Sequence, residues 1–355
     1  MTMTQRRSQA ASNDFSLLRQ ALLGEGGPER LPLWELHVDL PVKEAFLGYP
    51  IRSLADEVAF WVRAGYDYVP LSAGLVRVAG VLGGTTVSGE YGVYDSGDVD
   101  ITWAPEHEGP IVSLDDVAAF DWPDPDAMDL SHLEHVAAYL PSGMRIIAVI
   151  GKILTATWML LGFERFALAT VDNPELVAAV FERVAAIQNR VCERCLQLPF
   201  VGGLLMSDDI AYTEGLIVSP RVLREHLFPH YRRVGEKCHE VGVLFIYHSD
   251  GDLTQVMEDI LACGFHALHP IEPKAMDSRA VKRRWGGEIA LLGNVDLDLM
   301  ARGTSEQVRE YTEANLRDLG YDGRYGAGSS NSVTYYVPLE NYLALRGAVL
   351  ASRRG

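Results

Sequence analysis

Short apolar runs alternate with longer stretches of helical spacing over most of the chain. The runs of strand length are centred near residues 33, 67, 146, 203, 244, 267, 290 and 325. Short, almost fully apolar strands between helices are typical of a parallel sheet with both faces covered. Eight such units predict an α/β fold, the closed (β/α)8 TIM barrel. An open dinucleotide-binding sheet is the competing interpretation, but no G-x-G-x-x-G run lies between a strand and a helix.

Local signals set the boundaries of several elements. Asn13 or Asp14 is expected to cap a first helix that ends at Leu23, and Thr304 a long helix that ends at Leu319. The other expected strands lie over 31–38, 66–72, 145–151, 202–209, 243–252, 266–273, 290–296 and 323–330. The other expected helices lie over 52–64, 130–139, 155–170, 174–197, 253–262 and 277–284, with a helical pair over 219–240 and a C-terminal helix from Pro338.

The stretch over 74–103 breaks the rhythm after the second strand. It is rich in Gly, Val, Thr and Tyr, and it predicts one or two β-hairpins before an acidic, Pro-rich run to Pro125. We therefore expect a flexible N-terminus (1–13) and one barrel domain over 14–355 with an insertion at 74–125. The excursion could serve as a lid, as the contact of a homodimer or as a docking surface.

Charge and cysteine content narrow the function classes. The chain carries 31 Lys and Arg against 48 Asp and Glu, a net charge of −17. Such acidity argues against nucleic acid and anionic membranes as partners, because binding phosphates needs clustered cations. Four cysteines make no disulfide framework, and the pair Cys192 and Cys195 is expected to pack inside a helix. No run approaches the ~18 apolar residues of a membrane span, so we expect a soluble, cytoplasmic protein.

Polar groups follow nearly every predicted strand, and functional groups of a barrel gather at these strand ends. The carboxylates, imidazoles, amides and hydroxyls concerned are Glu35, His37, Asp39, Asp208, Asp209, His248, Asp250, Asp252, His269, Glu272, Asn294, Asp296, Ser329 and Asn331. Loop carboxylates often cap the next helix instead, and we expect Asp252 and Asp298 to do so.

The same strand ends resemble the uroporphyrinogen decarboxylase superfamily. The similar segments are 150–166, 207–231, 247–253, 264–273, 293–304 and 328–342, in that order, within a similarity from Leu31 to the C terminus. The resemblance implies an eight-stranded α/β barrel, in agreement with the strand count.

Two branches of that superfamily differ at the first strands. The resemblance to true decarboxylases would imply an Arg-Gln-Ala-Gly-Arg-Tyr signature after the first strand and an aspartate after the second. This chain has Glu35, His37 and Asp39 at the first position and no carboxylate over 70–74. An acidic site would repel a polycarboxylate, so porphyrinogen decarboxylation is disfavoured.

The other branch is the corrinoid-dependent methyltransferases. Its thiol-using members have His-x-Cys-Gly after the fifth strand and a further Cys near the eighth, which together bind Zn²⁺. Here the first motif reads His248, Ser249, Asp250, Gly251, and 328–330 contains no Cys. A harder site of His248, Asp250 and a nearby carboxylate could still hold Zn²⁺ or another divalent ion.

The first functional hypothesis is a methyltransferase of the O-demethylase type. It would move a methyl group between a methoxylated, aromatic small molecule and a cobalamin on a partner protein, since the chain contains no Asp-x-His-x-x-Gly run. Loss of methyl leaves an oxyanion that a general acid can protonate. His248 and Asp250 are the central acid–base or metal-binding pair. Asp208 and Asp209 support them, because paired carboxylates raise each other's pKa.

Substrate contacts are assigned to the remaining polar and aromatic strand-end residues. Glu35 and His37 would touch the substrate, Asn294 and Asn331 would orient it, and four aromatic residues would flank its ring or simply pack: Trp34, Tyr247, Tyr335 and Tyr336.

Two alternatives stay open. A decarboxylase or lyase acting on another small acid would need cations at the strand ends, for which Lys152 and Arg324 are the evident choices. A catalytically silent barrel that binds a ligand or a corrinoid protein is the third, although buried carboxylates without a use cost stability.

Overall fold

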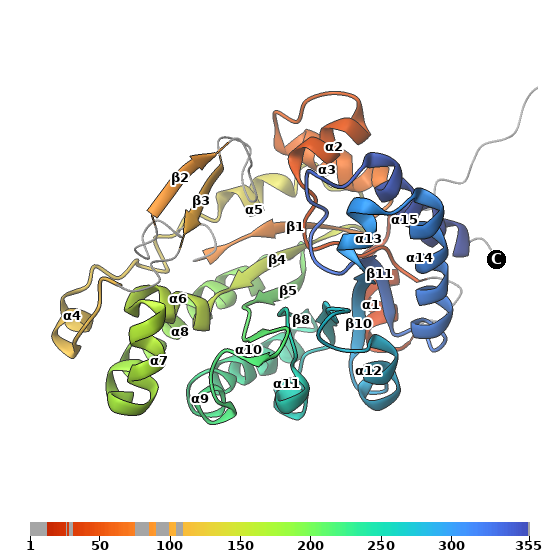
Figure 1. The fold of residues 1–355 in the computed structure, drawn as a ribbon. Helices are drawn as coiled ribbons and strands as arrows, with labels where there is room; N and C mark the ends of the chain where they lie inside the picture. The colour runs from red at the N-terminus through yellow and green to blue at the C-terminus, as the bar shows by residue number, and fades with distance from the viewer. Residues whose placement is uncertain are drawn as a thin grey trace, which may run out of the picture.

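A curled sheet of seven parallel strands forms the centre of the molecule (Figure 1). The computed structural model describes residues 13–25, 27, 31–74, 85–89, 99–103 and 109–353, with the backbone alone for 85–89 and 99–103. In sheet order the strands are β1 (Tyr68–Ser72), β4 (Arg145–Gly151), β5 (Val201–Ser207), β8 (Leu244–His248), β9 (Ala267–His269), β10 (Ala290–Val295) and β11 (Tyr325–Ser329). All six neighbouring pairs are parallel, which confirms seven of the expected strands.

Helices connect these strands and pack on the outer face of the sheet (Figure 1). The helices are α1 (Phe15–Leu23), α2 (Leu40–Leu47), α3 (Leu54–Ala64), α4 (Leu114–Ala119), α5 (Ser131–Val136), α6 (Ile153–Leu161), α7 (Phe163–Asp172), α8 (Pro174–Leu196), α9 (Pro220–His226), α10 (Phe228–Val241), the short 3-10 helix η4 (Thr254–Val256), α11 (Met257–Ala262), α12 (Ser278–Trp285), α13 (Leu297–Arg302), α14 (Ser305–Leu319) and α15 (Leu339–Ser352).

Capping explains where several helices begin. Asp14 caps α1 by accepting from the Ser16 N–H, and Thr304 forms a complete capping box with Gln307 at α14, both as expected. The predicted helix over 155–170 is instead two helices, α6 and α7, because Gly162 interrupts it with a φ of 80°. Helices α2, α4 and α13 are short and were not predicted.

The expected first strand is an irregular extended segment. It makes one parallel bridge, Leu33 to Ala327, on the β11 side, and a second bridge joins Val38 to Val333. On the other side the Tyr68 hydroxyl lies 2.7 Å from both the backbone N–H and the carbonyl of Glu35, in place of ladder bonds from β1. This side-chain pairing explains why the described residues show no ladder between the segment and β1.

Three further strands were predicted too long. β5, β8 and β9 end at Ser207, His248 and His269, so the polar residues after them lie in loops. The hairpin excursion is confirmed in part: β2 (Thr85–Gly89) pairs antiparallel with β3 (Val99–Trp103). The rest of 75–108 and residues 1–12 of the predicted flexible N-terminus lie outside the described residues. A small hairpin, β6 (Ala211–Tyr212) with β7 (Gly215–Leu216), was not expected.

The core fills both sides of the sheet with aliphatic and aromatic side chains. All four cysteines are buried and none forms a disulfide, which confirms that Cys192 and Cys195 pack within α8. None of the described helices has the length and apolar character needed to cross a membrane.

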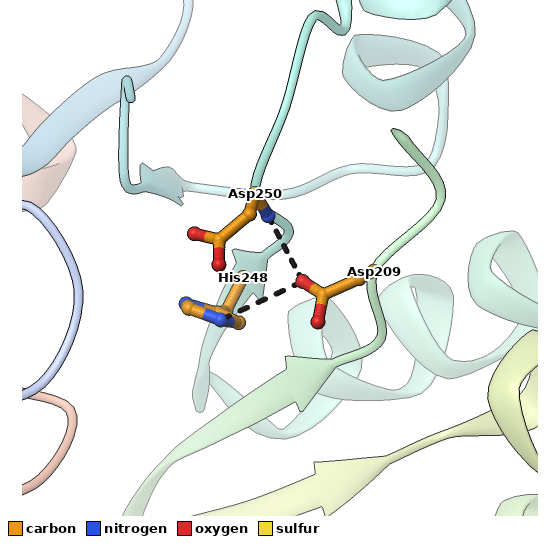
Figure 2. Close-up of side chains that lie close together, drawn as sticks. All are labelled: Asp209, His248 and Asp250. Carbon is orange, nitrogen blue, oxygen red and sulfur yellow. Dashed lines mark hydrogen bonds and ion pairs between the residues drawn. The ribbon is translucent and has the colours of Figure 1, made fainter. Parts of the chain in front are cut away.

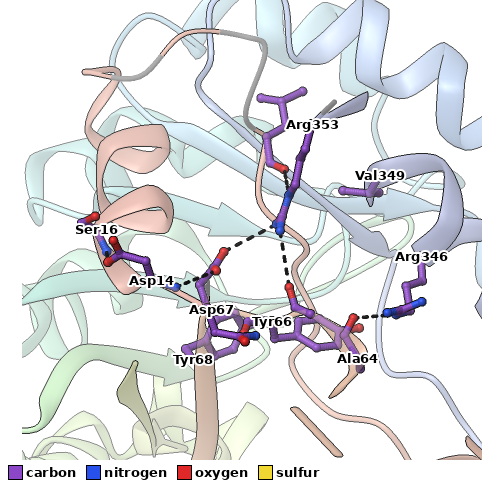
Figure 3. Close-up of polar contacts among 12 residues, drawn as sticks. Asp14, Ser16, Ala64, Tyr66, Asp67, Tyr68, Arg346, Val349 and Arg353 are labelled. Carbon is purple, nitrogen blue, oxygen red and sulfur yellow. Dashed lines mark hydrogen bonds and ion pairs between the residues drawn. The ribbon is translucent and has the colours of Figure 1, made fainter. Parts of the chain in front are cut away.

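A buried carboxylate holds the two ends of the described chain together at the amino edge of the sheet (Figure 3). Asp67, which is 1% exposed, accepts the Asp14 N–H at 3.1 Å and lies 3.5 Å from the Arg353 guanidinium. Arg353 also donates to the carbonyls of Leu31 (2.9 Å) and Gly65 (3.4 Å). The end of α15 is therefore pinned to the start of β1 and to α1.

Arg353→Ala is expected to lower the free energy of unfolding by about 2–3 kcal/mol, because it removes a charged donor from a buried carboxylate and from two carbonyls. Urea unfolding measures the change. The control is Arg302→Ala, which breaks an exposed pair with Asp298 and should cost under about 1 kcal/mol. Equal losses in the two variants would contradict the assigned role of Arg353.

Candidate functional site

Three side chains converge at the carboxyl ends of β5 and β8: Asp209, His248 and Asp250 (Figure 2). The two strands are neighbours, and Ser207 is in register with His248, so the residues just beyond them are side by side. One ligand atom from each of the three side chains lies within 4.8 Å of the others. The structure thus brings together three of the four residues predicted to be catalytic.

Backbone and side-chain contacts hold this cluster. The Asp250 N–H donates to Asp209 Oδ1 at 2.9 Å, and the same oxygen lies 3.8 Å from His248 Nε2 (Figure 2). Asn331 donates its amide N–H to Asp250 Oδ2 at 2.7 Å. Asp250 Oδ1 is buried and has no hydrogen-bond partner among the described residues, so it is available to a ligand.

A second histidine sets the tautomer of the first. His269 Nε2 lies 3.4 Å from the Ser329 carbonyl, which only accepts, so that nitrogen carries the proton. Burial lowers the pKa of His269 well below its usual range, and a neutral ring leaves its Nδ1 as an acceptor. His248 Nδ1, 2.8 Å away, must then donate. In its neutral form His248 therefore presents the Nε2 lone pair toward Asp209.

The pKa of the Asp250 carboxyl is raised above its usual range. Burial raises the pKa of Asp250 to about 6, and nearby Asp209 and Glu272 add to the rise. His248 and the Asn331 hydrogen bond act in the opposite direction. A carboxyl group in this range is suited to proton transfer near neutral pH.

The cluster borders an open cavity of about 530 Å³ at the carboxyl edge of the sheet. Its lining residues are Asp250, Glu272, Pro273, Lys274, Asp296, Leu297, Asp298, Ala301, Arg302, Ser330, Asn331 and Tyr336. Small-molecule sites commonly have volumes of roughly 300–1,000 Å³. Of the residues predicted to act in catalysis or to contact the substrate, Asp250, Asn331 and Tyr336 reach this cavity, and so do the strand-end acids Glu272 and Asp296.

Asp208 does not join the cluster, which corrects its assignment as a supporting acid. Its carboxylate accepts from the backbone N–H groups of Leu154 (2.7 Å) and Thr155 (3.0 Å) and from the hydroxyls of Thr155 and Tyr231 (2.8 Å each). Four donors saturate its acceptor sites. Burial, rather than Asp209, is the largest cause of its raised pKa. Asp208 fixes the first turn of α6 to β5.

Two of the predicted aromatic substrate contacts are packing residues. Tyr247 donates to the Asp208 carbonyl at 3.0 Å and stacks on Phe265, because its side chain points away from the face that His248 occupies. Trp34 is fully buried against the rings of Tyr68 and His269. Neither residue lines the cavity of about 530 Å³.

Most of the other residues assigned to substrate binding also lie away from the cavity. His37 pairs with Asp39 at 3.1 Å, and Asp39 in turn accepts the Tyr335 N–H at 2.8 Å; none of them lines the cavity, whereas Tyr336 does. Asn294 is buried, adopts a φ of 81° and donates to the Ile271 carbonyl.

Asn331 orients Asp250, and Glu35 is fully buried beneath the site. Asp252 was expected to cap a helix; it accepts the Thr254 N–H at 2.9 Å and so closes the turn before η4, whose N-cap residue is Leu253. The same expectation for Asp298 is wrong: Asp296 accepts the Asp298 N–H, and Asp298 pairs with Arg302.

The sequence did not lead us to the two cationic side chains that line the cavity. Lys274 and Arg302 line it, whereas Arg324 precedes β11 and lines a different cavity beside Leu22. Lys152 lines neither. Lys274 follows β9 by five residues, so the strand-end rule could have found it. Arg302 ends α13, a helix without a clear sequence signal.

The donor set fits a divalent cation. One imidazole nitrogen with a free lone pair and two carboxylates are ligands that Zn²⁺ and other borderline or hard ions accept. The Asp250 oxygen without a hydrogen-bond partner supports this fit. Asp209, at 52% side-chain exposure, would be the most easily adjusted ligand.

Comparison with known proteins places the chain in a family. Residues 60–351 match the uroporphyrinogen decarboxylase (URO-D) family, so the protein belongs to that family of enzymes. No curated protein matches the chain. A solved structure described as a methyltransferase from Methanosarcina mazei is similar in fold, with a TM-score of 0.70 and 17% identity over 96% of this chain and 97% of that chain.

Purified protein is expected to bind about one equivalent of Zn²⁺ or Co²⁺ at this cluster. His248→Ala and Asp250→Asn should each weaken binding at least ten-fold, because each removes one of three ligands. Titration calorimetry measures the affinity. Asp252→Asn is the control, since Asp252 accepts the Thr254 N–H in the turn before η4 and does not belong to the cluster. Unchanged binding in both cluster variants would refute the site.

Proposed function

We propose that this protein is a methyltransferase of the O-demethylase type. It moves a methyl group between a methoxylated, aromatic small molecule and a cobalamin carried by a partner protein. The observation that carries the proposal is the Asp250 carboxyl, whose Oδ1 has no partner among the described residues and which borders the cavity. Membership of the URO-D family and the fold shared with a methyltransferase support the reaction class.

Asp250 would supply the proton that methyl loss requires. When a methyl group leaves an ether oxygen, that oxygen becomes an alkoxide or phenolate, a poor leaving group unless it is protonated. A carboxyl with a pKa of about 6 is partly protonated near neutral pH. Asn331 donates to the other oxygen, Oδ2, and so fixes the orientation of the carboxyl group. In the reverse direction the carboxylate would accept the proton of the hydroxyl.

A bound divalent ion would offer a second way to stabilise the oxyanion. Asp209, His248 and Asp250 would hold it, and such an ion acts as a Lewis acid toward oxygen. Asp250 cannot be ligand and proton donor at once, so the metal content decides between these roles. The cobalt of the partner's cobalamin would supply the nucleophile.

The proposal also covers the closure of the barrel and the compartment in which the protein works. The segment 31–38 would complete the sheet as an eighth strand of a TIM barrel, since it already bridges to β11. The protein would work in the cytoplasm, where it would meet its corrinoid partner and its small-molecule substrate.

Asp250→Asn is expected to reduce methyl transfer 10²–10⁴-fold, because the amide neither protonates nor ligates as the acid does. Formation of methylcobalamin from a panel of methoxyarenes and a cob(I)alamin carrier, followed by absorbance, measures the rate. Asp298→Asn is the matched control, an aspartate on the same cavity whose charge is paired with Arg302. The absence of transfer by the unmodified protein across a broad panel would overturn the proposal.

A second candidate function is a decarboxylase or lyase of the same superfamily acting on a small acid. The observation that favours it is the presence of Lys274 and Arg302 on the cavity. The Arg302 charge is paired with Asp298, whereas no ion pair joins Lys274 to any described carboxylate. A substrate carboxylate could therefore pair with Lys274.

Under this alternative, small aromatic acids should release CO₂ without any corrinoid. Lys274→Met should then raise KM about ten-fold, because it removes a charge-assisted contact to the substrate. Carboxyl-labelled substrates give the readout, and Arg302→Gln is the control with its charge already neutralised. Methyl transfer with full retention of the labelled carboxyl would decide for the methyltransferase.

A further inference from the structure

A buried acid lies beneath the site and is not used by either proposed reaction. Glu35 is 0% exposed, and Ser329 contacts both of its carboxyl oxygens. The Ser329 N–H donates to Oε1 at 2.9 Å, and Ser329 Oγ lies 2.5 Å from Oε2. The Tyr68 hydroxyl holds the backbone of Glu35 from the other side. Glu35 is therefore fixed in both its main chain and its side chain.

The number of protons on Ser329 Oγ limits what this contact can be. That hydroxyl has one proton, and it also lies 3.1 Å from the Asn331 carbonyl, which can only accept. If Glu35 were a carboxylate, only one of the two contacts could be a hydrogen bond. If Glu35 is a carboxylic acid, it donates to Ser329 Oγ, and Ser329 donates to Asn331. The neutral acid thus satisfies every group.

We propose that Glu35 is kept as a neutral carboxylic acid and is the positioning residue of Asp250. The hydrogen-bond path runs from Glu35 to Ser329 Oγ, on to the Asn331 carbonyl, and from the Asn331 amide to Asp250 Oδ2. It fixes the orientation of the Asp250 carboxyl group at the border of the cavity. This role does not depend on which reaction the site performs.

Ser330 makes the path rigid between its two ends. Its N–H donates to the Val295 carbonyl at 2.7 Å, and its hydroxyl accepts from the Leu297 N–H at 3.1 Å. The turn after β11 is thereby attached to the end of β10. Movement of Ser329 would consequently move Asn331, rather than be absorbed within the loop.

The surroundings of Glu35 favour the neutral form. Burial raises the pKa of Glu35 to about 8, and its contacts with the hydroxyl and the N–H of Ser329 act in the opposite direction. The titratable groups that face it from β1, β11, α15 and the turn before β1 are uncharged tyrosines: Tyr66, Tyr68, Tyr325 and Tyr342. No cationic side chain among the described residues pairs with the Glu35 carboxyl, so ionisation would leave an uncompensated buried charge.

The protonated carboxyl is directly observable. At pH 7 the infrared spectrum of the full-length protein should contain the carbonyl band of a protonated carboxyl group that shifts on ¹³C labelling of glutamate. Glu35→Gln should remove that band. The Asn331 side-chain amide should keep its hydrogen-bonded NMR shift in Glu35→Gln, because the Gln amide also donates to Ser329. It should lose that shift in Glu35→Ala and in Ser329→Ala.

The pH dependence of the free energy of unfolding tests the protonation state of Glu35 independently. A carboxyl whose folded pKa lies above its unfolded value stabilises the fold below pH 4.5 and loses that contribution as pH rises to about 8. The unfolding equilibrium constant of the unmodified protein should rise up to ten-fold per pH unit in this window relative to Glu35→Gln, and level off above it. Glu44→Gln is the control, since Glu44 is only half-buried and accepts one N–H.

The infrared and NMR results together distinguish a neutral Glu35 from an ionised one. Absence of the labelled band, together with loss of the Asn331 shift in Glu35→Gln as complete as in Glu35→Ala, would show that the anion is needed and would overturn the proposal. If Glu35→Gln fails to fold, the labelled band of the unmodified protein and the Ser329→Ala spectrum still decide. No measurement uses a methyl donor or a corrinoid, so failure of methyl transfer leaves this inference untouched.

Discussion

Parallel pairing is the constraint on which the rest of this structure depends. Because β5, β8, β9, β10 and β11 all run in the same direction, the residues that leave them meet at one edge of the sheet. His248 ends β8, and Asp209, Glu272 and Asn331 follow β5, β9 and β11, so these residues lie near each other only for this reason. The helices and the apolar core hold this alignment, and the site is built almost entirely from what lies one to three residues past a strand.

Within that edge, burial decides the role of each acid. Asp208 and Asp209 are adjacent in the chain, yet one is enclosed by four donors and the other is half exposed. Asp250 lies between these extremes, with one oxygen held and one not. The same chemical group thus anchors a helix at Asp208, whereas on the proposed function it would be an adjustable ligand at Asp209 and an acid at Asp250, depending on the donors that surround it.

Strand order, most strand positions and several helix caps were predictable because they depend on local pattern and composition. The cluster of His248, Asp250 and Asp209 was also accessible, since parallel strand ends must meet. The role of Asp208 was not, because it depends on the N–H groups of α6, far away in sequence. Likewise the irregular segment 31–38 depends on a hydroxyl from Tyr68 that occupies the Glu35 backbone, and no one-dimensional pattern reports such a contact.

The carboxylate of Asp67 has a practical consequence for how the chain could be rearranged. Asp14 and Arg353 both reach this one side chain, so the start and the end of the folded body are neighbours at the amino edge, while the cavity lies at the opposite edge. A short linker could join the two ends, and new termini could be opened in a surface loop. Immobilisation or fusion close to Asp14 or Arg353 would accordingly leave the cavity facing solvent.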